Sequence, residues 1–244
     1  MTTTIWNTAD LSGVSLDATD LIATSTAAAG GVRVVNKAFL GKAYFEATMT
    51  TLTGGGTTVG VCNASWVLST GGNSSVNAAY AYKSGPIWIN NSSAGGTLGT
   101  LVSGSIVGVA VDLVNELIWF RVCPSGNWNG SSTANPATAT GGYSIGAISS
   151  PLKPVYVFAG FTASGDVVTA NFGATAFSGT VPSGFAPGWS TANGPTLNVV
   201  TQVGVEVWVQ NPSANRVTQI GAEIWRSVGV YVAPVAEPII MFLA

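Results

Sequence analysis

The segment SIVGVAVDLVNELIWF, residues 105–120, shows the pattern that decides the fold of this chain. Val107, Val109 and Val111 fall on one side of an extended backbone, and small or polar residues fall on the other. After the turn-forming Asn115, the apolar run LIWF begins again. β-Branched and aromatic residues dominate, and no helical spacing of three to four residues is kept. The segment therefore predicts a two-stranded hairpin, covered on both faces inside a two-sheet sandwich.

Similar short apolar runs, separated by Gly, Asn, Asp and Pro, continue along the chain to about residue 173, and no stretch signals a helix. The predicted strands are IW, GVSLD, LIATST and VRVV within residues 5–35, GKAYFEATM at 41–49, TVGVC at 58–62, AYAY and IWI within 63–100, PVYVFAGF at 154–161 and VVTANFG at 167–173. The Ser-, Gly- and Asn-rich remainder of residues 63–100, and residues 124–150, are predicted to be long loops.

Charged side chains are scarce in this sequence of 244 residues: they make up 7% of it, and the net charge is -2. The eight basic residues are scattered singly, so no basic stripe is present to neutralise phosphates, and we expect no nucleic-acid partner. The start MTTTIWNTADLSG lacks the features of a secretion signal, and no run approaches the ~20 apolar residues of a membrane span. We expect a protein made in soluble form, without membrane insertion.

The chain contains no histidine, which excludes Ser-His-Asp and Cys-His catalysis and the usual zinc ligands. We therefore expect no enzyme activity, no metal and no cofactor. Cys62 and Cys123 have strand-like surroundings and no CxxC spacing, which predicts two buried free thiols. Glu46 and Asp112 lie in or at the ends of core strands, where we expect each carboxylate to accept hydrogen bonds from turn backbone.

Four aromatic residues stand in the predicted loops: Trp66, Trp88, Trp128 and Tyr143. Flat apolar rings beside Asn and Ser can stack on a sugar or insert into a protein partner. Alternatively, they cap the ends of the sandwich. We select Trp66, Trp128 and Tyr143 as candidate ligand-binding residues, and we expect their loops to form one face of the molecule.

The composition changes after a region rich in Pro and Gly, near residue 190. Residues 198–208 read NVVTQVGVEVW and residues 215–225 read NRVTQIGAEIW, which match at seven of eleven positions. Each copy alternates in a way that predicts one strand, and residues 211–214 are expected to turn the chain between them. The end PVAEPIIMFLA is apolar and needs a partner to cover it.

We therefore interpret residues 191–244 as an assembly arm, the alternative being that it folds back on its own sandwich. The candidate assembly residues are the apolar ones of the repeats and the tail: Val203, Val205, Val207, Trp208, Ile220, Ile224, Trp225 and Phe242.

The order of motifs resembles the SPRY (B30.2-like) family over about residues 6–185. The motifs are GKxYFE at 41–46, VGV at 59–61, YxY at 80–82, IVGVAVD at 106–112, IWF at 118–120, PVY at 154–156 and NFG at 171–173. The continuation through VPSGF at 181–185 is similar to SPRY domains of bacteriophage structural proteins. Residues 103–105 lack the acidic residue usual in the family, and Asn115-Glu116 replaces Asn-Gly; both departures concern turns.

The resemblance implies an all-β fold: a concanavalin-like antiparallel β-sandwich of the jelly-roll type at residues 1–190, followed by the β-strand arm. It also implies a binding role with no defined ligand. We expect a non-enzymatic bacteriophage virion protein, displayed on a fibre, tail or capsid surface and attached by its C-terminal strands. Its expected partners are other virion proteins, further copies of itself, and a host-surface glycan or protein. The alternatives are a soluble lectin or peptide-binding SPRY module outside any particle, and a glycan-degrading enzyme with two facing carboxylates.

Overall fold

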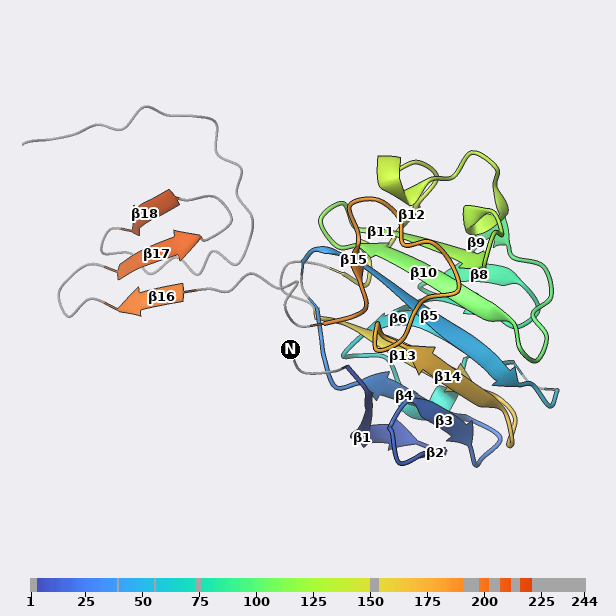
Figure 1. Ribbon diagram of the computed structural model, residues 1–244. Coiled ribbons are helices and arrows are strands. Elements are labelled where there is room, and N and C mark those ends of the chain that lie inside the picture. Colours follow the sequence, from blue (N-terminus) through green and yellow to red (C-terminus); the bar gives the residue numbers. More distant parts are fainter. Residues whose placement is uncertain are drawn as a thin grey trace, which may run out of the picture.

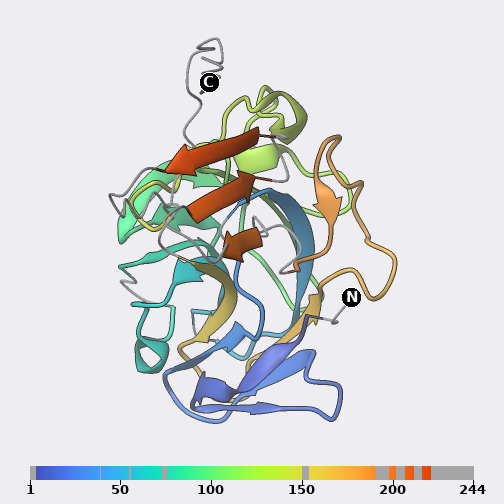
Figure 2. The same ribbon diagram turned by 90° about the vertical axis from the view of Figure 1, so that its left-hand side faces the viewer.

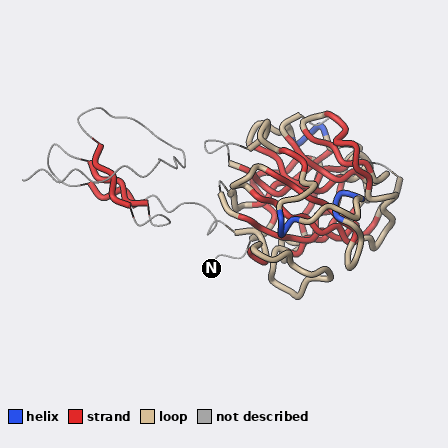
Figure 3. The backbone as a smooth tube through the Cα atoms, turned by 90° about the horizontal axis from the view of Figure 1, so that it is seen from above, coloured by secondary structure: helices blue, strands red, loops and turns tan. Residues whose placement is uncertain are grey.

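The protein is built from two antiparallel β-sheets stacked face to face, which confirms the predicted all-β sandwich (Figure 1). The computed structural model describes residues 4–38, 40–54, 56–72, 76–149, 154–190, 198–201, 207–211 and 216–220. Within these residues helix occurs only as short turns, as Figure 3 shows: η1 (Leu68–Thr70), η2 (Trp128–Gly130) and η3 (Pro136–Thr138). No helix in the described part of the chain has the length and apolar character of a membrane span.

The strands of each sheet come from distant parts of the sequence. The seven-stranded sheet has the order β1 (Trp6–Ser12), β4 (Gly30–Val34), β13 (Val155–Phe161), β6 (Thr58–Asn63), β7 (Ala78–Tyr82), β8 (Pro86–Ile89), β9 (Ser92–Thr97). The eight-stranded sheet has the order β12 (Tyr143–Ser144), β11 (Leu117–Val122), β10 (Ile106–Asp112), β5 (Lys42–Thr51), β14 (Val167–Asn171), β3 (Ile22–Ser25), β2 (Val14–Leu16), with the short β15 (Ala186–Pro187) parallel to β5.

The hairpin predicted from residues 105–120 forms as β10 and β11, in register from Val107 opposite Val122 to Asp112 opposite Leu117. β10 also pairs with β5 on its other side, so it lies inside the sheet as expected. Val107, Val109 and Val111 are fully buried between the sheets. Ala110, on the other face, belongs to a second buried cluster beneath covering loops. The hairpin is therefore covered on both faces.

Alternate residues of the facing strands form the core between the two sheets. From the eight-stranded sheet come Phe45, Ala47, Met49, Val107, Val109, Val111, Ile118 and Phe120; from the seven-stranded sheet come Val32, Val34, Val59, Val61, Ala79, Ala81, Val157, Ala159 and Phe161. Small alanines and large aromatic rings both occur in this core, which suits the close packing of a protein interior.

Strand β9 lies in a stretch that the sequence predicted to be loop. Its residues, SSAGGT, have no apolar alternation and are mostly exposed. It is held by backbone pairing with β8, where Trp88 lies opposite Ser93. The prediction was wrong here because β9 is stabilised by hydrogen bonds to the backbone edge of β8, and not by burial of its own side chains.

The C-terminal residues form a three-stranded antiparallel sheet of their own: β16 (Asn198–Thr201), β17 (Val207–Asn211) and β18 (Arg216–Ile220). Thr201 pairs with Val207, so the chain reverses within the first repeat, and the prediction of one strand per copy was wrong for that copy. Asn211 pairs with Arg216, which confirms the predicted turn between the copies. Val203, Val205, Ile224, Trp225 and Phe242 lie outside the described residues.

Loops gather at both ends of the sandwich, and one end carries a hollow in its surface. Four connections meet there: residues 52–57 between β5 and β6, residues 83–85 between β7 and β8, residues 98–105 between β9 and β10, and residues 162–166 between β13 and β14. Figures 1 and 2 agree that the dark-blue N-terminal strands lie along one border of the sandwich and the yellow-green segment between β11 and β12 along the opposite border.

The turn after β10 is held by Asp112, which is fully buried. Its carboxylate accepts hydrogen bonds from the backbone N–H groups of Val114 and Asn115, both at 3.0 Å, and contacts the Lys42 ammonium at 2.9 Å. Burial raises the pKa of Asp112, but the hydrogen bonds from Lys42 and Asn115 outweigh burial and leave the pKa below its ordinary value. The expected role of this residue as an acceptor for turn backbone is confirmed.

This arrangement predicts a pH-dependent stability. The folded-state pKa of Asp112 lies below the unfolded value of about 3.9. The ionised carboxylate therefore contributes its full stabilisation of the folded state above that pH, and this stabilisation is lost as the pH falls through the folded-state pKa. The substitution Asp112→Asn should lower the free energy of unfolding by about 2 kcal/mol at pH 7, and by much less near pH 2. Urea unfolding at several pH values measures this. The control Asp20→Asn should cost less than about 0.5 kcal/mol at each pH; an undiminished loss for Asp112→Asn near pH 2 would contradict the assignment.

Candidate functional site

The outer face of the eight-stranded sheet carries a buried aromatic cluster. It consists of Tyr44 of β5, Trp119 of β11 and Phe185, which are nearly fully covered. Tyr44 and Trp119 point outward because they alternate with the core residues of their strands, and Phe185, from the segment between β14 and β15, packs against Trp119. The segments that follow β11 and β14 cover this face, contributing Trp128 and Phe177 at its margin. A face that would be polar in a simple antiparallel sandwich is thus a second small core.

Glu46 is the charged centre of this face, and it is 3% exposed. Its carboxylate accepts hydrogen bonds from the Tyr44 hydroxyl at 2.6 Å and from the backbone N–H groups of Ser178 and Gly179 at 2.9 and 2.7 Å. The Cys123 thiol lies 3.4 Å from the same carboxylate. The predicted role of Glu46, as an acceptor for loop backbone, is confirmed. It fixes the covering loop to β5.

The two polar groups beside Glu46 are held in their neutral forms. Burial, together with hydrogen bonds to Cys123 and Glu46, raises the pKa of the Tyr44 phenol well above its ordinary value. Burial also raises the pKa of the Cys123 thiol, and it strongly raises that of the fully buried Cys62. Both cysteines are free, as predicted, although Cys123 is only partly buried. Thiols held neutral in this way are poor nucleophiles and poor metal ligands.

Trp128, one of the three candidate ligand-binding residues, packs against a buried arginine side chain. The Arg121 guanidinium lies 4.4 Å from its ring centroid and donates a hydrogen bond to the Thr180 carbonyl at 2.7 Å. Trp128 itself is partly exposed. One part of the ring is therefore engaged in a cation–π contact, and ligand binding by the remainder stays a prediction.

Trp66 lies on the outer face of the other sheet. It belongs to a cluster with Cys62, Tyr80 and Phe158, it is 3% exposed, and its ring centroid is 4.3 Å from that of Phe158. A Cβ atom on Gly31 would come within 2.4 Å of the ring. Both faces of the indole are therefore covered by protein, and Trp66 is not available for stacking on a ligand.

Tyr143 is found at a third place. It lies in the edge strand β12 opposite Ile118, is partly buried, and has its hydroxyl beside Gly96 of β9. Burial raises the pKa of this phenol. The two sheets thus separate Trp66 from Trp128, whereas Tyr143 lies on the same sheet as Trp128, with Gly96 beside both its hydroxyl and the Asn129 carbonyl. The predicted single face that includes Trp66 does not form. The sequence did not show this, because the sheet face that each loop covers depends on which distant strands pair with each other. That pairing is not visible in the local sequence.

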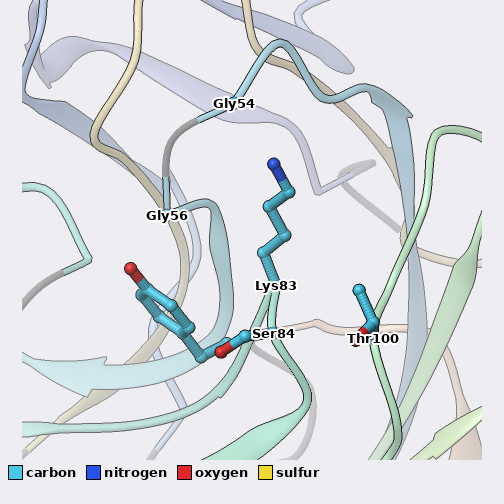
Figure 4. Close-up of a pocket in the computed structure, with 6 residues that line it drawn as sticks. Gly54, Gly56, Lys83, Ser84 and Thr100 are labelled. Atoms are coloured by element: carbon cyan, nitrogen blue, oxygen red, sulfur yellow. The ribbon is translucent and has the colours of Figure 1, made fainter.

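The end of the sandwich carries a shallow hollow of about 400 Å³ that the sequence analysis did not select. We call it the Lys83 hollow; it is lined by Gly54, Gly56, Tyr82, Lys83, Ser84 and Thr100 (Figure 4). The Lys83 side chain extends toward the loop at Gly54, with Thr100 on its other side. The only sequence signal was the cluster of glycines at residues 54–56, which we interpreted as a turn.

Acidic residues near this end serve as structural anchors. Asp166 is fully buried and accepts hydrogen bonds from the Thr53 N–H and hydroxyl at 2.6 and 2.7 Å, and also from the Thr57 hydroxyl. Among the described residues, no group of three or more Cys, Asp or Glu side chains is placed to hold a metal ion. The chemistry that the Lys83 hollow offers is therefore one ammonium, three hydroxyls and an aromatic ring.

Comparison with known proteins supports the fold. The chain matches the crystal structure of the SPRY domain of human HERC1 with a TM-score of 0.52 and 14% identity, covering 68% of this chain and 96% of that one. The chain has a SPRY-like fold. Weaker matches are the PSpry domain of TRIM65, with a TM-score of 0.48, 14% identity and coverage of 70% and 92%, and a human SPRY domain, with a TM-score of 0.47, 15% identity and coverage of 68% and 99%. No family model matches the chain, and no curated protein matches it.

The burial of the two tryptophans in the SPRY-like sandwich predicts different responses to substitution. Trp66→Ala should lower the free energy of unfolding by about 3–5 kcal/mol, because it leaves a cavity against Phe158. Trp128→Ala should cost about 1–2 kcal/mol, because its ring is partly exposed and loses mainly the contact with Arg121. Chemical denaturation compares the two, with Val102→Ala, at a side chain 62% exposed, as the control. Equal small losses for both tryptophans would show that Trp66 is not a core residue.

Proposed function

We propose that this protein is a non-enzymatic SPRY-like binding module, carried on a bacteriophage particle and attached there by its C-terminal strands. The observation that carries the proposal is the combination of a SPRY-like sandwich of two sheets with a third sheet that has its own strand order, β16 to β18. The sandwich presents rigidly held loops, which are the usual location of binding residues. The likeness of the VPSGF ending to SPRY domains of bacteriophage structural proteins supports the particle as its location.

The absence of enzyme activity is supported by the chemistry of the side chains. The chain has no histidine. The buried carboxylates Glu46, Asp112 and Asp166 are each occupied by hydrogen bonds to loop backbone or hydroxyls. A glycosidase needs two carboxylates that face each other across a groove, and none of the six residues lining the Lys83 hollow is acidic. This favours a module that binds over one that cleaves.

Attachment through the C-terminal strands is supported by the small size of their sheet. Three strands of four or five residues are marginally stable in water unless another surface covers one face. Val207 and Ile220, two of the candidate assembly residues, lie directly opposite each other in the register of β17 and β18. We propose that copies of this chain provide the covering surface, so that the arm forms a homo-oligomer that joins other virion proteins.

The particle itself provides the direct test. Mass spectrometry of purified phage particles from the source of this sequence should detect the protein in a fixed ratio to a known structural protein. Its presence only in the lysate, together with binding to glycan or peptide arrays, would support the rival reading of a soluble lectin or peptide-binding module and would overturn the virion role.

Removing the arm should separate binding from assembly. A chain that ends at Pro195 should remain soluble, keep the melting transition of the sandwich and run as a monomer in size-exclusion chromatography with light scattering, whereas the full chain should run as an oligomer. The expectation rests on the closed core of the sandwich, whose last buried aromatic residue is Trp189, 1% exposed. An insoluble truncated protein, or one that assembles like the full chain, would contradict the assignment of residues 191–244 as the assembly element.

A further inference from the structure

We propose that the Lys83 hollow binds a sugar residue that carries a carboxylate, such as an acidic monosaccharide at the end or branch of a surface glycan. The inference rests on the proposed binding role and supplies a ligand class for it. It starts from the charge at the site. The two ion pairs found among the described residues join Arg33 to Asp10 and Lys42 to Asp112. The partly buried Lys83 belongs to neither pair.

The Lys83 ammonium is therefore available to a ligand. No hydrogen bond of this side chain to another described residue is found, and its long stem reaches toward Gly54 across the hollow (Figure 4). A charge pair near a protein surface is several times stronger than the same pair in bulk water. On a chain in which only 7% of residues are charged, such a cation provides a specific point of attraction for an anion.

The walls of the hollow are fixed to one another by backbone hydrogen bonds. The Lys83 N–H donates to the Thr57 carbonyl at 2.9 Å, and the Leu101 N–H donates to the Lys83 carbonyl at 2.8 Å. The Gly56 N–H donates a hydrogen bond to the Thr162 hydroxyl, and the hydroxyls of Thr53 and Thr57 donate hydrogen bonds to the Asp166 carboxylate. Little ordering is thus needed when a ligand enters, which lowers the cost of binding a small molecule.

The remaining groups match a hydroxylated ring better than a bare anion. The hydroxyls of Ser84 and Thr100 can donate and accept hydrogen bonds, as sugar hydroxyls require. Tyr82 contributes an aromatic ring, on which the apolar face of a sugar can stack. Ser84 and Thr100 are exposed, and a Cβ atom on Gly54 would meet nothing within 4 Å, so the rim is open. A volume of about 400 Å³ suits one sugar residue.

An acidic side chain of a protein partner would satisfy the same ammonium, but the surroundings favour the sugar. A peptide that adds as a strand needs a row of unpaired backbone groups. Here the backbone groups of Lys83 are already paired on both sides, with Thr57 and Leu101. The hollow therefore offers side-chain hydroxyls and one charge, and no strand edge.

Amide NMR titration of the full chain tests the proposal. The probes are glucuronic acid, N-acetylneuraminic acid, neutral glucose and acetate. We expect at least one acidic sugar to shift the amide signals of Lys83, Ser84 and Thr100, and to bind about tenfold or more tightly than glucose or acetate. Lys83→Gln should weaken that binding about tenfold, and Thr100→Val about threefold. Lys37→Gln is the matched control, because it removes an equal charge before the start of β5, at the opposite end of the sandwich, and should change affinity less than about twofold.

Three results would overturn the inference. The first two are acidic sugars that produce no shifts around the hollow, and binding that Lys83→Gln leaves unchanged while its spectrum shows an intact fold. Acetate binding as tightly as the acidic sugars would also overturn it, by identifying the ligand as a simple carboxylate such as a protein side chain. These outcomes are independent of the presence of the protein in particles and of assembly through the arm, so a failure here is distinguishable from a failure of the proposed function.

Discussion

The backbone pairing of β5 with its neighbours is the interaction on which the rest of the structure depends. This strand bonds to β10 along seven residue pairs, from Ile106 opposite Thr48 to Asp112 opposite Lys42, and on its other side to β14 and β15. With both edges satisfied, its two faces are free to build two cores. Phe45 and Met49 fill the space between the sheets, while Tyr44 and Glu46 hold the covering loops on the outside.

Charge is used sparingly in this protein, and mainly as a means of fixing loops. Glu46 fixes the segment at Ser178 and Gly179, Asp112 fixes the β10–β11 turn, and Asp166 fixes the loop after β5. A buried carboxylate is tolerated only when donors compensate for its lost hydration, and backbone N–H groups of turns provide them. With only 7% of the residues charged, the protein presents mainly hydroxyls, amides and aromatic rings to its surroundings, so an ammonium outside both described ion pairs, such as that of Lys83, is an uncommon group on it.

The covering of the outer faces restricts where a partner can bind. Loops on the eight-stranded sheet shield Tyr44 and Trp119, and Trp66 shields Phe158 on the other sheet. Among the described residues, neither of these clusters leaves its aromatic rings open to solvent, so under the proposed function the binding surface lies at the loop ends or on the C-terminal sheet. This division is consistent with a module in which the sandwich binds and the arm assembles.

The alternation of residues 105–120, the strands around GKAYFEATM and PVYVFAGF, and the resemblance to SPRY domains were sufficient to predict the sandwich. Extended segments with apolar or small residues on both faces are a feature of local sequence, and these strands are buried on both faces. The roles of Glu46 and Asp112 were also predictable, since a carboxylate in a core strand needs donors. The sequence could not show that Trp66 and Trp128 lie on opposite outer faces, that SSAGGT forms β9, or that Lys83 meets Gly54 and Thr100. Those relations depend on which distant strands pair and in which register, and pairing at long range is decided by the whole core and not by any one segment.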